Sequence, residues 1–161
     1  MTRKKYKSIR YTRPPPSNEE VLDWCRKNWE VLRYWENIYI LNPDTKGTVN
    51  PSWDQFNCKL VDLIVETPGY MNILETDPTV LMQSFGQNLV YEWYITNEKY
   101  YNSLKDRKVP NSKQLFFHPD EFPFYDAKHV RSWIFVRETD PMIQRVCNDP
   151  KFHVRVVEIP L

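Results

Sequence analysis

The chain has 161 residues, of which 41% are hydrophobic and 15% aromatic, with a formal net charge of only +1. This composition supplies the core of a single domain and excludes a chain that is disordered throughout. No apolar run reaches the roughly 18–20 residues of a membrane span, so we expect no contact with a membrane. Three cysteines, an odd number without CxxC spacing, indicate a reducing compartment, either the cytoplasm or a virus particle assembled there.

The first 16 residues are predicted to form a basic, extended arm. They contain no acidic residue, whereas the other 145 residues hold 16 basic and 21 acidic side chains, so an arm of charge +6 precedes a body of charge −5. Pro14-Pro15-Pro16 favours a stiff polyproline II spacer. Charge of one sign is typical of interaction tails, and we predict that the arm contacts nucleic acid or an acidic protein surface. A solvated tail is the alternative. The predicted contact residues are Arg3, Lys4, Lys5, Lys7, Arg10 and Arg13.

Residues 17–110 are predicted to be helical. Ser17 and Glu20 have the spacing of a capping box, and apolar residues spaced by three or four predict a helix over 18–40. A turn-rich stretch separates this helix from a second one predicted over 52–66. Asp77-Pro78 predicts the start of a third helix, over 78–105, and a short helical piece is predicted over 70–74.

The last part of the domain, residues 111–161, is predicted to contain a loop followed by a small β element. An aromatic and proline-rich loop over 111–126 precedes a strand over 130–138, a short helix capped by Asp140-Pro141, and a strand over 152–159. The two strands pair either in parallel, through a crossover, or antiparallel. The predicted fold class is therefore α+β but mainly α, with three substantial helices and a small C-terminal strand–helix–strand element. A single domain over 17–161 follows the arm.

Aromatic residues lie around most of the circumference of the third predicted helix. A chain of this size cannot bury all of them easily, and Tyr and Trp are enriched at protein interfaces. We therefore predict an interface there, with burial in the core as the alternative. The predicted interface residues are Tyr91, Trp93, Tyr94, Tyr100 and Tyr101.

No pattern of residues identifies a catalytic site. Metal-ligating residue types gather between His118 and His129, but HxH, HExxH and CxxC motifs are absent. The ligand types in this stretch are His118, Asp120, Glu121, Asp126 and His129. No serine or cysteine has a motif that indicates a nucleophile. The sequence thus predicts no enzymatic activity, no cofactor and no metal.

The predicted function is that of a non-catalytic structural or assembly subunit of a large complex, either a virus particle or a ribonucleoprotein. Its expected partners are other protein subunits, bound through the aromatic surface, and RNA or DNA or an acidic neighbour, bound through the arm. Two alternatives remain open. One is a metal-dependent enzyme that acts on nucleic acid through the region from His118 to His129, and the other is a soluble adaptor whose arm is a docking peptide.

Overall fold

The computed structural model describes residues 14–41, 58–79, 82–97, 126–151 and 154–161. A five-stranded mixed sheet lies at its centre, with the strands in the order β1-β2-β3-β4-β5. The strands are β1 (Arg33–Leu41), β2 (Cys58–Thr67), β3 (Tyr70–Asp77), β4 (Val130–Val136) and β5 (Val154–Glu158). The helices are α1 (Asn18–Asn28), α2 (Met82–Thr96), the 3-10 helix η1 (Ala127–His129) and α4 (Pro141–Cys147). Among the described residues, no helix is long and apolar enough to cross a membrane.

The sheet has an antiparallel half and a parallel half. β1, β2 and β3 are antiparallel neighbours, and β2 turns into β3 at Pro68-Gly69. Gly69 has a φ of 78°, a conformation that glycine adopts without steric penalty. β3 pairs in parallel with β4, and β4 pairs in parallel with β5. Along the chain, α2 lies between β3 and β4, and α4 lies between β4 and β5.

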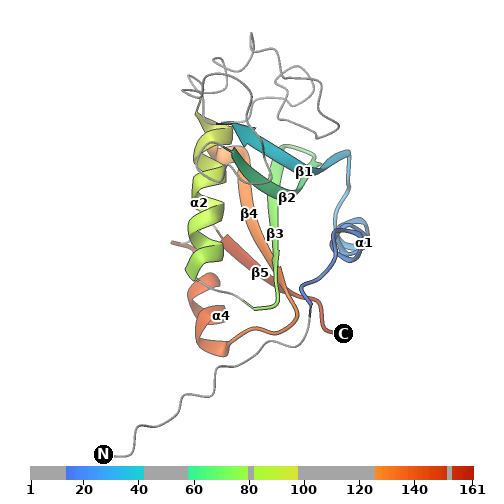
Figure 1. Cartoon of the computed structure of the whole chain (residues 1–161), viewed down its shortest axis with the longest axis vertical. Helices are drawn as coiled ribbons and strands as arrows, with labels where there is room; N and C mark the ends of the chain where they lie inside the picture. The colour runs from blue at the N-terminus through green and yellow to red at the C-terminus, as the bar shows by residue number, and fades with distance from the viewer. Residues whose placement is uncertain (1–13, 42–57, 80–81, 98–125, 152–153) are drawn as a thin grey trace, which may run out of the picture.

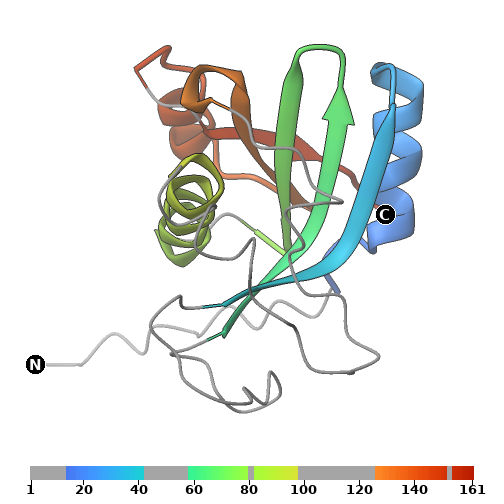
Figure 2. The same cartoon turned by 90° about the horizontal axis from the view of Figure 1, so that it is seen from above.

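Helices cover both faces of the sheet. α1 lies on one face, and α2 and α4 lie on the other (Figures 1 and 2). The α1 face has a core of Val21, Leu22, Cys25, Leu63, Val65, Leu74 and Phe135. The α2 face has a core of Ile38, Val61, Ile64, Met71, Ile73, Tyr91, Ile95 and Val130. Both faces of the central strands are therefore buried, which has direct consequences for the sequence pattern of β2 and β3.

The predicted mainly helical fold is wrong, because the dominant element is the five-stranded sheet. The second predicted helix, over 52–66, is strand β2 where the structure describes it, and the piece predicted over 70–74 belongs to β3. Strands buried on both faces carry continuous apolar runs instead of an alternating pattern, and their apolar residues can match a helical spacing by coincidence. The capping box of Ser17 and Glu20 is confirmed, but α1 ends at Asn28, and strand β1 begins five residues later at Arg33.

The predicted C-terminal strand–helix–strand element is confirmed. Its two strands, whose relative direction the sequence left open, pair in parallel. β4, α4 and β5 form where strand, helix and strand are expected, and the side chain of Asp140 caps α4 by accepting a hydrogen bond from the backbone N–H of Met142. The third predicted helix is α2, which begins later than expected, at Met82. Residues 98–105 of that prediction, and the loop predicted over 111–125, lie outside the described residues.

Arg137, which follows β4, joins the N-terminal and C-terminal segments of the domain. Its side chain is only 5% exposed, and it donates two hydrogen bonds to the carboxylate of Glu20, at 2.7 and 3.0 Å. It also donates to the carbonyl oxygens of Pro14, Pro15 and Ile159. These charge-assisted bonds, chiefly from Arg137, hold the pKa of Glu20 at about 2. The described proline residues of the arm are thus anchored on the domain.

Candidate functional site

Strand β2 is irregular at Asp62, in the middle of the sheet. In a regular strand, Val61 and Leu63 would lie on the same face. Instead, Val61 packs under α2 together with Ile64, whereas Leu63 packs under α1. The neighbouring strand β1 has its own irregularity at the same level, because Asn37 adopts a φ of 51° between two residues that pair with Val61 and Leu63. Asp62 therefore lies where the regular ladder of the sheet is interrupted.

The side chain of Asp62 replaces the backbone pairing that is missing at this point. Regular pairing of β2 with β3 reaches only Leu63 and Leu74. Beyond it, Oδ2 of Asp62 accepts hydrogen bonds from the backbone N–H of Thr76 at 3.1 Å and from its hydroxyl at 3.2 Å. In return, Oε1 of Glu75 accepts from the backbone N–H of Asp62 at 3.4 Å. These hydrogen bonds keep the side chains of Asp62 and Glu75 next to one another at the irregular position of the sheet.

A third carboxyl group, that of Asp77, completes what we call the carboxyl cluster (Asp62, Glu75 and Asp77). Glu75 and Asp77 alternate along β3 with Leu74, whose side chain packs on the α1 face, so both acids point toward α2. The hydroxyl of Ser84, in the first turn of α2, donates to Oδ2 of Asp77. Glu75 and Asp77 therefore lie on the side of the sheet that α2 covers.

Burial and like charge change the titration of Glu75 and Asp77. Glu75 is only 6% exposed, and burial together with the neighbouring charge of Asp62 raises its pKa to about 10. Burial also raises the pKa of Asp77, and Asp62 contributes to that shift. At neutral pH, Glu75 is therefore a neutral carboxylic acid in the metal-free protein. Carboxyl groups with strongly raised pKa values are candidates for a functional role.

The sheet-facing side of α2 lines the cluster with polar groups instead of apolar ones. Ser84, Asn88 and Tyr91, which are four and three residues apart, lie on one buried side of this helix. The hydroxyl of Tyr91 donates to the carbonyl oxygen of Leu60 at 2.8 Å. Burial raises the pKa of Tyr91, and the charges of the carboxyl cluster raise it further. This polar layer makes the interface between α2 and the sheet unlike an ordinary hydrophobic core.

Carboxylate and amide oxygens are the ligands that hard divalent cations prefer. Within the described ranges, however, no three side chains of the types His, Cys, Asp and Glu are arranged to hold an ion by themselves. Magnesium needs only one or two protein carboxylates, because water and substrate phosphates supply its remaining ligands. The arrangement of Asp62 and Glu75 can therefore contribute two ligands of a larger set, or exchange a proton between two carboxyl groups.

Several predicted site residues lie outside the described residues. These are the six basic residues of the arm from Arg3 to Arg13, the interface residues Tyr100 and Tyr101, and His118, Asp120 and Glu121. Two residues of the predicted ligand stretch are described. The ring of His129 lies 6.4 Å from that of Tyr70, and Asp126 is exposed and 3.9 Å from the ammonium group of Lys128.

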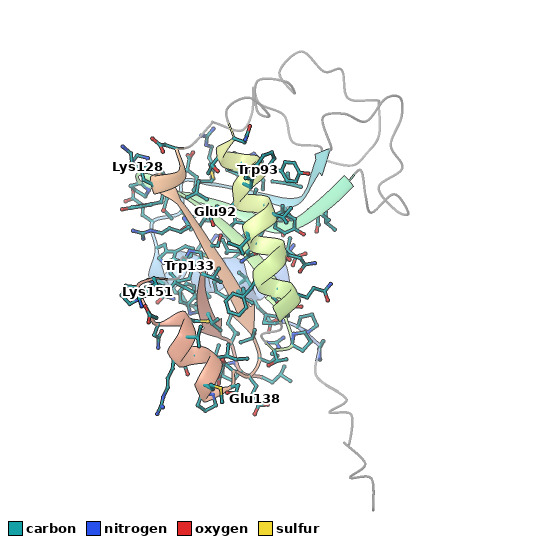
Figure 3. The ribbon with its side chains drawn as sticks, turned by 90° about the vertical axis from the view of Figure 1, so that its left-hand side faces the viewer. Glu92, Trp93, Lys128, Trp133, Glu138 and Lys151 are labelled. Atoms are coloured by element: carbon teal, nitrogen blue, oxygen red, sulfur yellow. The ribbon has the colours of Figure 1, made fainter. Side chains whose placement is uncertain are left out.

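The three described residues of the predicted interface have different environments. Tyr91 is 4% exposed and belongs to the core, so its ring presents no surface to a partner. Trp93 is 55% exposed near the C-terminal end of α2, as Figure 3 shows, and its ring contacts that of Tyr94. Tyr94 is half-buried against the core. An outward-facing apolar side of α2 exists, and it also includes Leu89 and Val90.

The carboxyl cluster was not predicted from the sequence. The signal that marks it is an acidic residue within a mostly apolar run of a central strand. Asp62 interrupts the apolar run from Leu60 to Val65 in β2, and Glu75 follows the buried residues Ile73 and Leu74 in β3.

Comparison of the chain with models of protein families, with curated proteins and with solved structures gives no match.

Proposed function

We propose that the protein is a hydrolase that cleaves phosphodiester bonds in nucleic acid, with the carboxyl cluster at its reaction centre. The observation that carries this proposal is the convergence of Asp62 and Glu75 at an interruption of the sheet, with a third carboxyl group two residues away at Asp77. Burying carboxyl groups against one another destabilises a fold. Such an arrangement is therefore more typical of a functional site than of a structural core.

The charge of the chain supports an anionic substrate. The arm carries +6, and Arg137 donates hydrogen bonds to the carbonyl oxygens of Pro14 and Pro15, which are the described residues that follow its basic side chains. A basic segment raises the local concentration of a polyanion such as nucleic acid. Carboxylates alone repel a phosphodiester, so the reaction requires a divalent cation, which would polarise the phosphoryl oxygen and activate water. Asp62 and Glu75 are the residues that would hold it.

A cleavage assay tests the proposal. We expect the full-length protein, freed of metals and then supplied with Mg²⁺ or Mn²⁺, to cleave labelled DNA or RNA, and Glu75→Gln to lower the rate about 100-fold or more, because the amide cannot replace the carboxylate at the cation. Glu158→Gln is the matched control, since Glu158 is exposed on β5. Absence of cleavage on all substrates, or equal rates for the wild type and Glu75→Gln, contradicts the proposal. Denaturation curves confirm that each variant is folded.

A second candidate function is the non-catalytic assembly subunit predicted from the sequence. The observation that favours it is the apolar outer side of α2, where Leu89 is 59% and Trp93 is 55% exposed. The helix α4 lies on the same face of the sheet as α2 (Figure 1), and its residue Met142 is 74% exposed. Exposed apolar patches of this kind are typical of contact surfaces.

Substitution on this surface separates the second candidate from the first. We expect Leu89→Lys to weaken self-association or co-purification of a protein partner about tenfold or more, measured by light scattering and by affinity purification, because a charge placed in an apolar contact opposes its burial. Cleavage of nucleic acid should be unchanged. If Leu89→Lys alters neither association nor co-purification, the outer side of α2 is not an interface. Gln144→Lys, on the exposed side of α4, is the control for added charge.

A further inference from the structure

One buried oxygen atom on the sheet-facing side of α2 has no hydrogen-bond partner among the described residues. Asn88 is fully buried, its Nδ2 donates to the carbonyl oxygen of Trp133 at 3.3 Å, and its Oδ1 accepts from nothing. In the part of the chain that the structure describes, only one other buried side-chain oxygen, Oγ1 of Thr139, is in this situation. A buried polar atom without a partner destabilises the folded protein by about 1–3 kcal/mol, so each such atom calls for a physical explanation.

The position of Asn88 relates this oxygen to the cluster. Ser84, one turn earlier on α2, donates to Asp77, and Tyr91, one turn later, is close enough to the cluster for its three charges to raise the pKa of its hydroxyl. Asn88 lies between these two residues on the same side of the helix. Its Nδ2 donates to the carbonyl oxygen of Trp133 on β4. Trp133 pairs with Leu74 on β3, and Leu74 directly precedes Glu75. Asn88 thus faces the level of the sheet at which the carboxyl groups meet.

We propose that Oδ1 of Asn88, together with the carboxyl groups of Asp62 and Glu75, forms a binding site for a divalent cation under α2. This proposal rests on the function proposed above and specifies its cofactor site. The three ligands are oxygen atoms from three separate elements, β2, β3 and α2. A ligand set of carboxylate and amide oxygens favours a hard cation such as Mg²⁺ or Mn²⁺ over Zn²⁺, which prefers His and Cys.

This ligand set contains only two residues of the types His, Cys, Asp and Glu, because the third ligand is an amide, and among the described residues no three side chains of those types are arranged to hold an ion. Asp77 lies two residues beyond Glu75 on β3, and its Oδ2 accepts the hydroxyl of Ser84, one turn of α2 before Asn88. Asp77 is therefore placed beside the cation and not among the proposed ligands. With two protein carboxylates and one amide oxygen, an octahedral cation keeps positions for water and for a substrate phosphate.

Binding of Mn²⁺ to the full-length protein tests the site independently of catalysis. The protein is stripped with a chelator, Mn²⁺ is added, and the free ion is measured by electron paramagnetic resonance. We expect the wild type to bind Mn²⁺, Asn88→Leu to weaken the affinity about tenfold or more, and Asn88→Asp to bind at least as tightly as the wild type, because a carboxylate oxygen replaces the amide oxygen. Asn28→Leu, at the exposed end of α1, is the matched control and should bind like the wild type.

Each outcome decides between the two proposals. If the wild type binds no Mn²⁺, or if Asn88→Leu and the wild type bind equally, the cation site is wrong. If Asn88→Leu does not fold, Asn88→Asp decides, because a loss of affinity in that variant overturns the site. Binding that depends on Asn88 without cleavage of any nucleic acid overturns the proposed function and leaves the site standing. If cleavage depends on Glu75 but Mn²⁺ binding does not depend on Asn88, the cation site is overturned and the proposed function stands.

Discussion

Replacing Glu75 with glutamine is expected to stabilise the metal-free protein, and to do so more strongly as the pH rises. The pKa of Glu75 is raised from 4.5 to about 10, so the folded protein retains a proton that the unfolded chain releases above pH 4.5. Between these two values the folded state binds more protons than the unfolded state, and its stability therefore falls with increasing pH. Each pH unit contributes up to about 1.4 kcal/mol, which amounts to about 3 kcal/mol at pH 7.

Glutamine has the shape of the protonated acid but is neutral at every pH. Urea denaturation of the wild type and Glu75→Gln, in chelator and at pH values from 5 to 8, should give a difference in unfolding free energy that is small at pH 5 and grows with pH. The other groups that face this position, Asp62, Asp77 and Tyr91, are present in both proteins. Glu158→Gln should show no such trend. A difference that does not depend on pH would mean that Glu75 titrates normally.

The same substitution is expected to lower the rate of cleavage about 100-fold or more and to increase the stability of the metal-free protein. A residue that lowers stability and is nevertheless required for activity is a known property of functional sites, where charged groups are placed against the preferences of the fold. A purely structural role for Glu75 makes the opposite prediction, because removal of a stabilising contact lowers the unfolding free energy. Measurement of both quantities on one variant therefore distinguishes a functional carboxyl group from a structural one.

The second large effect is expected from Arg137→Ala. The buried guanidinium group makes hydrogen bonds to Glu20 and to the carbonyl oxygens of Pro14, Pro15 and Ile159. Its removal leaves a cavity and takes the donors from these carbonyl groups, and we expect a loss of about 3 kcal/mol in unfolding free energy at pH 7. Urea denaturation measures this loss. Arg145→Ala, on the exposed side of α4, is the control and should lie within about 0.5 kcal/mol of the wild type.

Acid should reduce the effect of Arg137→Ala. The pKa of Glu20 is lowered to about 2, chiefly by Arg137, so the stability that this pair contributes is present above pH 4.5 and is lost as the pH falls toward 2. The difference between the wild type and Arg137→Ala should therefore shrink in acid. Arg137→Lys should recover only part of the stability, because an ammonium group cannot form the two parallel bonds to the carboxylate. Full recovery with lysine would contradict this account of the geometry.

Local signals in the sequence correctly predicted where α1 and α4 begin. The capping box at Ser17 and the Asp140-Pro141 start of α4 depend on hydrogen bonds within a few residues, and both are confirmed. The strand character of β4 and β5 was visible because their β-branched and aromatic residues are concentrated. These features depend on local chemistry, and a single sequence is sufficient to find them.

The central strands could not be assigned in this way, because their pattern depends on tertiary burial. β2 is covered by α1 on one face and by α2 on the other, so it has no polar side to produce alternation. The carboxyl cluster was missed for a related reason. Asp62 and Glu75 are 13 residues apart and meet only because β2 and β3 form a hairpin. Once β2 was assigned to a helix, no argument from spacing could bring these two acids together.

The hydrogen bonds of Arg137 also bring together two segments that are far apart in the sequence. One guanidinium group binds residues ahead of α1 and a residue that follows β5, so both ends of the described fold emerge from the same side of the molecule (Figure 1). The backbone at Pro14 and the backbone at Ile159 are therefore held close to one another by a single side chain. Loss of this one side chain is therefore expected to release both segments at once.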